Sequence, residues 1–115
     1  PNAARGGSHI GSIGAADLVE AGLCDVLASD YFYPAMLAAI DRLDREKRAD
    51  RVTLWSLMSS GPARAMKLSD RGSITIGSRA DLVLMDWTKG QTPVVEGTWI
   101  AGRAAFRVQT QKHLN

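Results

Sequence analysis

The stretch CDVLASDYFYP, residues 24–34, places a carboxylate where an active site could form. Its first part is mostly small or aliphatic and predicts a buried strand that ends on Asp30. In parallel α/β folds, active sites form on the loops that follow the carboxyl ends of the strands. Asp30 is therefore well placed for chemistry, but an Asp at this point could also cap the helix that follows. The residues by themselves leave both roles open.

Few other side chains offer a ready-made site. The sequence has His9 and His113 as its only histidines and Cys24 as its only cysteine. It contains no H-x-H, H-E-x-x-H or C-x-x-C motif, so we do not predict a metal site built by this chain alone. A single cysteine fits a reducing compartment, and we expect a cytoplasmic protein. Because Cys24 lies in an apolar run, we expect a small buried side chain and not a nucleophile.

Helices on both sides must position the predicted strand. Apolar residues recur at helical spacing, and Gly or Pro marks the segment ends. The pattern predicts helices at residues 15–23, 33–47 and 51–60, with a break at Gly61-Pro62 and a short helix after it. A glycine-rich loop, a helix and an apolar strand make half of a βαβ unit, which is the unit of parallel sheets and barrels. This part of the chain is therefore α/β.

The chain changes character after residue 68. Alternating apolar residues, separated by glycine turns, predict a set of strands. The strands cover residues 72–76, 80–87 and 93–108, with turns at Gly77-Ser78 and Ala101-Gly102. An all-β unit over residues 69–115 thus follows an α/β unit over residues 1–68.

Composition and charge narrow the class of protein. The chain has 115 residues, enough for one domain at most. It has 14 Lys and Arg against 12 Asp and Glu, and this formal charge of +2 is too small to indicate a nucleic-acid partner. No apolar run approaches the roughly 18 residues of a membrane span, so we expect no membrane partner either.

Three motifs resemble the amidohydrolase superfamily, and within it the branch of phosphonate metabolism. PNAARGGSHIGSIGAADL (residues 1–18) is similar to that branch's loop after the seventh barrel strand, written P-N-x-x-R-G-G-S-H-S-G-N. GLCDVLASDYFYPAMLAAI (residues 22–40) resembles its eighth strand and the helix that follows. SSGPARAMKLSDRGSITIGSRADLVLMD (residues 59–86) resembles the ending of the superfamily, N-P-A-x-x-L-G-L followed by G-x-I-x-x-G-x-x-A-D-L-V. Together the three motifs span nearly the whole chain.

The resemblance implies a fold and an activity. Residues 1–68 would be the last strand and helices of a (β/α)8 TIM barrel, and residues 69–115 a small β-sandwich segment. The activity would be that of a metal-dependent hydrolase that releases diphosphate from ribose methylphosphonate triphosphate, with a divalent metal such as zinc. In this family the aspartate that ends the eighth strand contacts the metal and takes a proton from the attacking water. The resemblance therefore makes Asp30 both a metal ligand and a catalytic residue.

The same resemblance implies that Arg5, Gly6, Gly7, Ser8 and His9 bind the substrate, a phosphorylated sugar. Backbone amides of glycines can converge on an anion, and an arginine can make a bidentate contact with phosphate. The alternative is a glycine-rich turn with an arginine that faces solvent.

The chain departs from the family pattern at two places. Residues 10–12 read Ile-Gly-Ser where the family has S-G-N, so this half of the loop could bind differently. Gly61 replaces the usual Asn before Pro62, which we expect to affect only a helix cap. The aromatic side chains of residues 31–33 could line a pocket or pack beneath the barrel rim.

The family's other metal ligands lie upstream of the residues present here. We therefore expect a fragment of a longer enzyme, inactive by itself and possessing no metal of its own. Apolar faces and open strand edges that neighbours would cover predict a homo-oligomer, with contacts from Gly72 onward. The alternative is a non-catalytic anion-binding or assembly module with the same fold. An H-x-H motif upstream of Pro1 would favour the enzyme.

Overall fold

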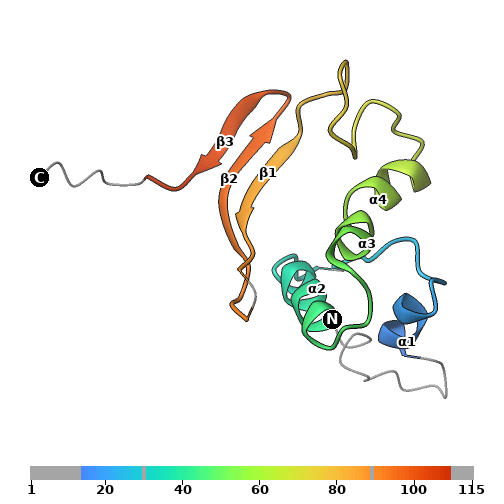
Figure 1. The fold of residues 1–115 in the computed structure, drawn as a ribbon. Helices are drawn as coiled ribbons and strands as arrows, with labels where there is room; N and C mark the ends of the chain where they lie inside the picture. Colours follow the sequence, from blue (N-terminus) through green and yellow to red (C-terminus); the bar gives the residue numbers. More distant parts are fainter. Residues whose placement is uncertain (1–13, 30, 89, 110–115) are drawn as a thin grey trace, which may run out of the picture.

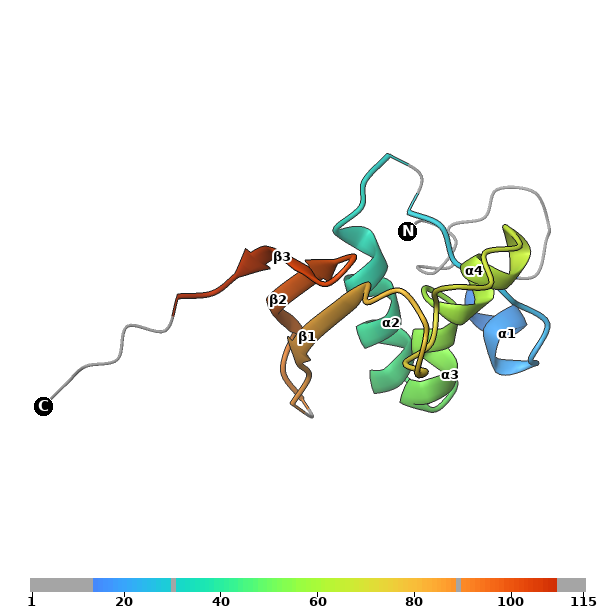
Figure 2. The same ribbon diagram turned by 90° about the horizontal axis from the view of Figure 1, so that it is seen from above.

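The computed structural model describes residues 14–29, 31–88 and 90–109. Four helices gather in one part of the molecule and three strands in another, as Figures 1 and 2 show. The helices are α1 (Ala15–Glu20), α2 (Ala35–Arg45), α3 (Arg51–Ser56) and α4 (Ser60–Ala65). The strands are β1 (Leu82–Asp86), β2 (Val94–Ile100) and β3 (Arg103–Arg107). The predicted helices at 15–23 and 33–47 are confirmed, with shorter bounds.

A small apolar core holds the helices together. Ile40 and Leu43 of α2 are buried, as their spacing predicts, and they pack with Leu54 and Leu57 of the α3 region and with Val19 of α1. Burial of such side chains contributes roughly 1.5–3 kcal/mol each, so this cluster is the main source of stability among the helices.

The predicted break between the last two helices is displaced. Helix α3 ends at Ser56, and α4 already includes Gly61 and Pro62. Pro62 lies in the first turn of α4, where a backbone N–H has no partner within the helix, so proline can start a helix there. The chain turns at residues 57–59, where the Ser59 hydroxyl donates to the Trp55 carbonyl at 2.9 Å.

The predicted strand at residues 24–29 is wrong for the described part of the chain. A strand needs the hydrogen-bond ladder of a neighbour, and the described strands all lie after residue 81. The segment instead makes one backbone bond to the helices, from Leu27 N–H to the Leu57 carbonyl at 2.9 Å. Cys24 is partly buried and packs against the helical core, as expected of a small apolar side chain, and its thiol lies 3.5 Å from the Val26 carbonyl.

The three strands form one antiparallel sheet in the order β1-β2-β3. The predicted turn between β2 and β3 is confirmed: Ala101 and Gly102 have φ of 51° and 78°, the left-handed pair of a tight hairpin. The predicted strand at 72–76 is wrong, because its alternating isoleucines find no partner strand and are fully exposed. The described strands make a single sheet, so the β-sandwich stays a prediction.

A polar junction ties the sheet to the helices. The Trp87 indole N–H, just after β1, donates to the Asp41 carboxylate at 3.2 Å, and Asp41 is the one buried charged residue among those described. The Arg51 guanidinium lies 4.3 Å from the centre of the Trp87 ring and donates to the Trp87 carbonyl at 2.5 Å. Arg45 completes the junction with a 2.8 Å bond to Asp41.

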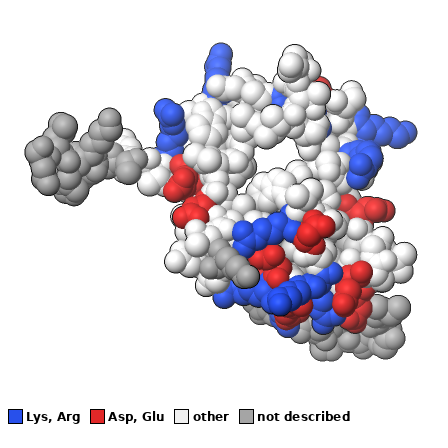
Figure 3. All heavy atoms as spheres, viewed as in Figure 1, with Lys and Arg blue, Asp and Glu red and all other residues white. Residues whose placement is uncertain are grey.

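Charged side chains of both signs intermingle over the helices, as Figure 3 shows. Arg48 bridges to Asp17 and Glu20 of α1 at 3.1 and 2.6 Å, and Arg42 pairs with Glu46 along α2 at 2.8 Å. This arrangement is typical of a solvated helix face. Within the described residues no helix is long and apolar enough to cross a membrane.

Three helices end in the same way, with a left-handed residue after the last turn. Gly22 fills this position after α1, but lysines fill it after α2 and α4: Lys47 has φ of 55° and Lys67 has φ of 57°. Behind Lys67, the Leu68 N–H donates to the Ala63 carbonyl at 2.8 Å. This geometry favours glycine, since a side chain costs roughly 1–2 kcal/mol in the left-handed region.

We predict that Lys67→Gly stabilises the chain. Removal of the side chain relieves the left-handed strain, while the more flexible unfolded glycine offsets part of the gain, which leaves about 0.5–1 kcal/mol. Urea denaturation measures the free energy of unfolding. Lys67→Ala is the control, because it removes the charge but keeps the Cβ, and equal stability of the two variants would contradict the prediction.

Candidate functional site

The side chains that the sequence assigns to chemistry lie outside the described residues. These are Arg5, Gly6, Gly7, Ser8, His9 and Asp30. Their roles in substrate binding, catalysis and metal binding therefore stay predictions. The structure describes the segments on either side of Asp30.

The helix that follows Asp30 begins at Ala35, and its N-cap residue is Pro34. Among the described residues no side chain caps this helix end. The chain reaches α2 through backbone turns, in which Phe32 N–H donates to the Ser29 carbonyl at 3.3 Å and Ala35 N–H to the Phe32 carbonyl at 3.1 Å. Asp30 itself lies outside the described residues, so its cap role and its chemical role both stay predictions.

The aromatic side chains after Asp30 face solvent. Tyr31 is 91% exposed, Phe32 60% and Tyr33 82%. The expectation that they pack beneath a rim is wrong for the described residues. They flank the candidate site and are not part of a core.

The segment before Asp30 rests on helix α4 at Gly61. A Cβ added to Gly61 would lie 2.1 Å from the Asp25 carbonyl oxygen and 2.9 Å from the Ser56 carbonyl oxygen. The expectation that Gly61 affects only a helix cap is wrong, because this buried glycine lets two stretches of backbone meet. Sequence reasoning noticed the departure from Asn but had no sign of the contact.

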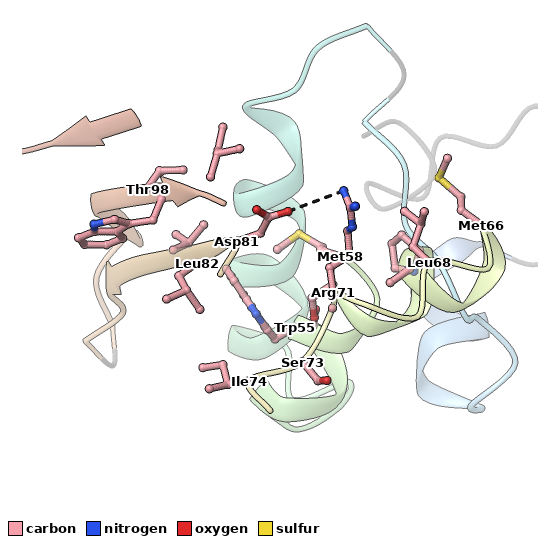
Figure 4. Close-up of a pocket in the computed structure, with 17 residues that line it drawn as sticks. Trp55, Met58, Met66, Leu68, Arg71, Ser73, Ile74, Asp81, Leu82 and Thr98 are labelled. Carbon is pink, nitrogen blue, oxygen red and sulfur yellow. Dashed lines mark hydrogen bonds and ion pairs between the residues drawn. The ribbon is translucent and has the colours of Figure 1, made fainter. Parts of the chain in front are cut away.

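A groove of about 640 Å³ lies between α3, α4, the loop after them and strands β1 and β2 (Figure 4). Its walls are mostly apolar, with Trp55, Met58 and Leu82 among the lining side chains. At its edge Arg71 and Asp81 lie 3.8 Å apart. The lining has no cysteine or histidine, and its one carboxylate is already bonded, so the groove offers no catalytic set.

Asp81 holds the hairpin turn. This residue is the Asp of the A-D-L-V motif, and its carboxylate accepts from the Ala101 N–H and from Arg79, both at 2.8 Å. The bond from the Ala101 N–H, with help from Arg79 and Arg71, lowers the pKa of Asp81 below its ordinary value. The motif therefore fixes the β2–β3 turn to the start of β1.

A metal site cannot be assembled from the described residues alone. They hold no group of three or more His, Cys, Asp or Glu side chains placed to bind a cation. Asp30 is the metal ligand that the resemblance predicts in this chain, and one ligand does not complete a site of the usual three or four.

Comparison with known proteins defines the class of protein. A model described as Amidohydrolase family matches residues 9–106, which is most of the chain, and the chain belongs to this family. A crystal structure of an amidohydrolase from Thermotoga maritima MSB8 superposes with a TM-score of 0.69 at 25% sequence identity. The match covers 83% of this chain and 27% of that one.

The particular relative comes from Escherichia coli (strain K12). Over 109 residues the chain is 39% identical to its alpha-D-ribose 1-methylphosphonate 5-triphosphate diphosphatase. The match covers 92% of this chain and 28% of the relative, so the chain spans little more than a quarter of the protein it resembles. The resemblance to this branch of the family, drawn from the motifs, is confirmed.

We predict that Asp81→Asn destabilises the chain in a pH-dependent way. Because the pKa of Asp81 is lower in the folded state than its ordinary 3.8, its carboxylate stabilises the fold above that pH, and the contribution is lost as the pH falls through the folded pKa. The Asn variant should therefore be less stable at pH 7, with a difference that disappears in acid. Denaturation at a series of pH values measures this, and a difference independent of pH would contradict it.

Proposed function

We propose that this chain is part of a metal-dependent hydrolase of phosphonate metabolism. The enzyme would cleave a phosphoanhydride bond of ribose methylphosphonate triphosphate and release diphosphate. The observation that carries the proposal is the 39% identity, over 92% of the chain, to a relative named for that substrate and reaction. We assign residues 1–68 to the end of a TIM barrel and residues 69–115 to a β-sandwich segment.

In this proposal Asp30 has two roles. Its carboxylate would help to hold a divalent metal and would accept the proton of the attacking water. A divalent metal such as zinc, when bound, lowers the pKa of its water toward neutrality. The loop of Arg5, Gly6, Gly7, Ser8 and His9 holds the phosphates, with backbone amides and the guanidinium as donors. Since one ligand does not complete a metal site, we expect the 115-residue chain to be inactive by itself.

We predict that this chain can replace the matching quarter of the Escherichia coli relative. The chimeric enzyme should release diphosphate from ribose methylphosphonate triphosphate, and Asp30→Asn should lower kcat by at least about a hundredfold because the proton acceptor is lost. Colorimetric measurement of diphosphate gives the rate. Asp25→Asn is the matched control, because it alters an exposed carboxylate on the same segment.

Two outcomes would contradict the proposal. In the first, the chimera binds metal and is active, but Asp30→Asn works as well as the control. In the second, the chimera folds and binds metal but hydrolyses only substrates without a phosphoanhydride bond.

We also propose that the chain forms a homo-oligomer through its sheet. Val94, Ile100 and Phe106 are each about half exposed, at 57%, 51% and 49%, and the outer edge of β3 has no neighbour within the described residues. Exposed apolar surface and open edges of this kind drive association.

Light scattering at increasing concentration tests the oligomer. We predict a dimer or larger species, and Phe106→Arg should weaken the association by about tenfold or more, because a charge would be buried at the contact. Thr53→Arg, on the exposed face of α3 and outside the predicted contact region, is the control and should leave the association unchanged. A monomer at all concentrations would contradict the prediction.

A further inference from the structure

Gly61 lies where two stretches of backbone meet at closer range than any side chain allows. An added Cβ would lie 2.1 Å from the Asp25 carbonyl oxygen, well inside the 3.0 Å that real Cβ atoms keep. Gly61 does not have the left-handed φ that several other glycines have, so the demand for glycine is one of space and not of backbone conformation.

The atoms that a side chain at residue 61 would meet cannot move aside at a low cost in energy. At Gly97 an added Cβ would meet the ring of Trp99, which is a side chain, and at Gly14 it would make an ordinary 3.5 Å contact with the Asp17 carboxylate. At Gly61 it meets the carbonyl oxygens of Asp25 and Ser56, which are both backbone atoms. Any side chain there must displace the chain itself.

A second contact fixes the same segment two residues further on. The Leu27 N–H donates to the Leu57 carbonyl at 2.9 Å, in the turn between α3 and α4. The side chains of Asp25 and Val26 are exposed, while those of Cys24 and Leu27 pack against the helical core. This packing and the bond from Leu27 hold residues 24–29 on the helices, and the contact at Gly61 limits how closely the segment can approach.

We propose that Gly61 is a positioning residue for the site that Asp30 belongs to. Because Gly61 has no side chain, segment 24–29 can lie close against α4. Asp30 follows directly at the end of this segment. The catalytic part of this inference rests on the proposed function. Ordinary contact begins at 3.4 Å, so a side chain at residue 61 would push the segment away by about 1 Å. A displacement of that size can cost roughly a hundredfold in rate when it reaches the reacting groups.

The family pattern usually has Asn at this position, and Asn carries a Cβ. In this chain a Cβ at residue 61 would meet backbone atoms, so Gly61→Asn should not be neutral even though it restores the common residue.

The position of segment 24–29 on the helices can be measured on the 115-residue chain. In Gly61→Ala and Gly61→Asn, NMR should show a shifted Leu27 amide resonance and at least about tenfold faster hydrogen exchange at that amide. The amides of α2 should exchange at rates changed only by the overall loss of stability. Gly14→Ala, which adds the same methyl group where there is room, is the control. An unshifted Leu27 resonance, or equal acceleration at Leu27 and throughout α2, would overturn the inference.

The consequence for Asp30 is measured in the chimeric enzyme. Gly61→Ala should lower kcat by about tenfold to a hundredfold with little change in KM, and it should have no further effect in an Asp30→Asn background. Additive losses in the double variant would show that Gly61 acts on stability and not through Asp30, and would overturn its positioning role. If the chimera with Gly61 released no diphosphate, the proposed function would fail. The NMR result would still decide whether Gly61 sets the position of segment 24–29.

Discussion

The Trp87 indole joins the sheet to the helices, and the arrangement of the two parts depends on it. Its N–H meets the buried carboxylate of Asp41, while Arg51 covers its ring and bonds its carbonyl. A buried carboxylate is costly unless its hydrogen bonds are satisfied, and Arg45 and Trp87 together satisfy this one. Because Asp41 lies on the helix that begins just after Asp30, the junction also fixes the helix on which the candidate site depends.

The helices could be predicted well from local sequence patterns, since the apolar spacing of a helix and the Gly or Pro at its ends lie within or next to its own residues. The apolar stripe of α2 places Ile40 and Leu43 in the core, and the hairpin at Ala101-Gly102 needs only its two residues to be recognised. The strand predictions at residues 24–29 and 72–76 failed for the opposite reason. A strand is completed by a partner, and an apolar or alternating run says nothing of whether a neighbour is present to form the ladder.

The candidate site shows the same difference between local signals and contacts with residues far away in the sequence. Asp30 and the loop from Arg5 to His9 could be proposed from motifs, because their residue types and order are written in the chain. Gly61 could not be understood in that way. The sequence shows that Gly61 replaces the usual Asn, but the need for glycine comes from a contact with Asp25, which is far away in the sequence. Only the folded structure shows that the two residues meet. A glycine that replaces a usual polar residue next to a proline is the one signal that could have prompted the question.

Several of the described polar groups hold the frame. Asp81 fixes the hairpin turn, Asp50 accepts from Thr53 N–H at the start of α3 and its pKa is lowered by that bond, and Arg48 ties α1 to α2. A carboxylate bonded in this way is a poor proton acceptor, because a proton would have to displace an existing hydrogen bond. In the function that we propose, the chemistry belongs to Asp30 and not to these groups, and segment 24–29, which rests on Gly61, leads directly to that residue.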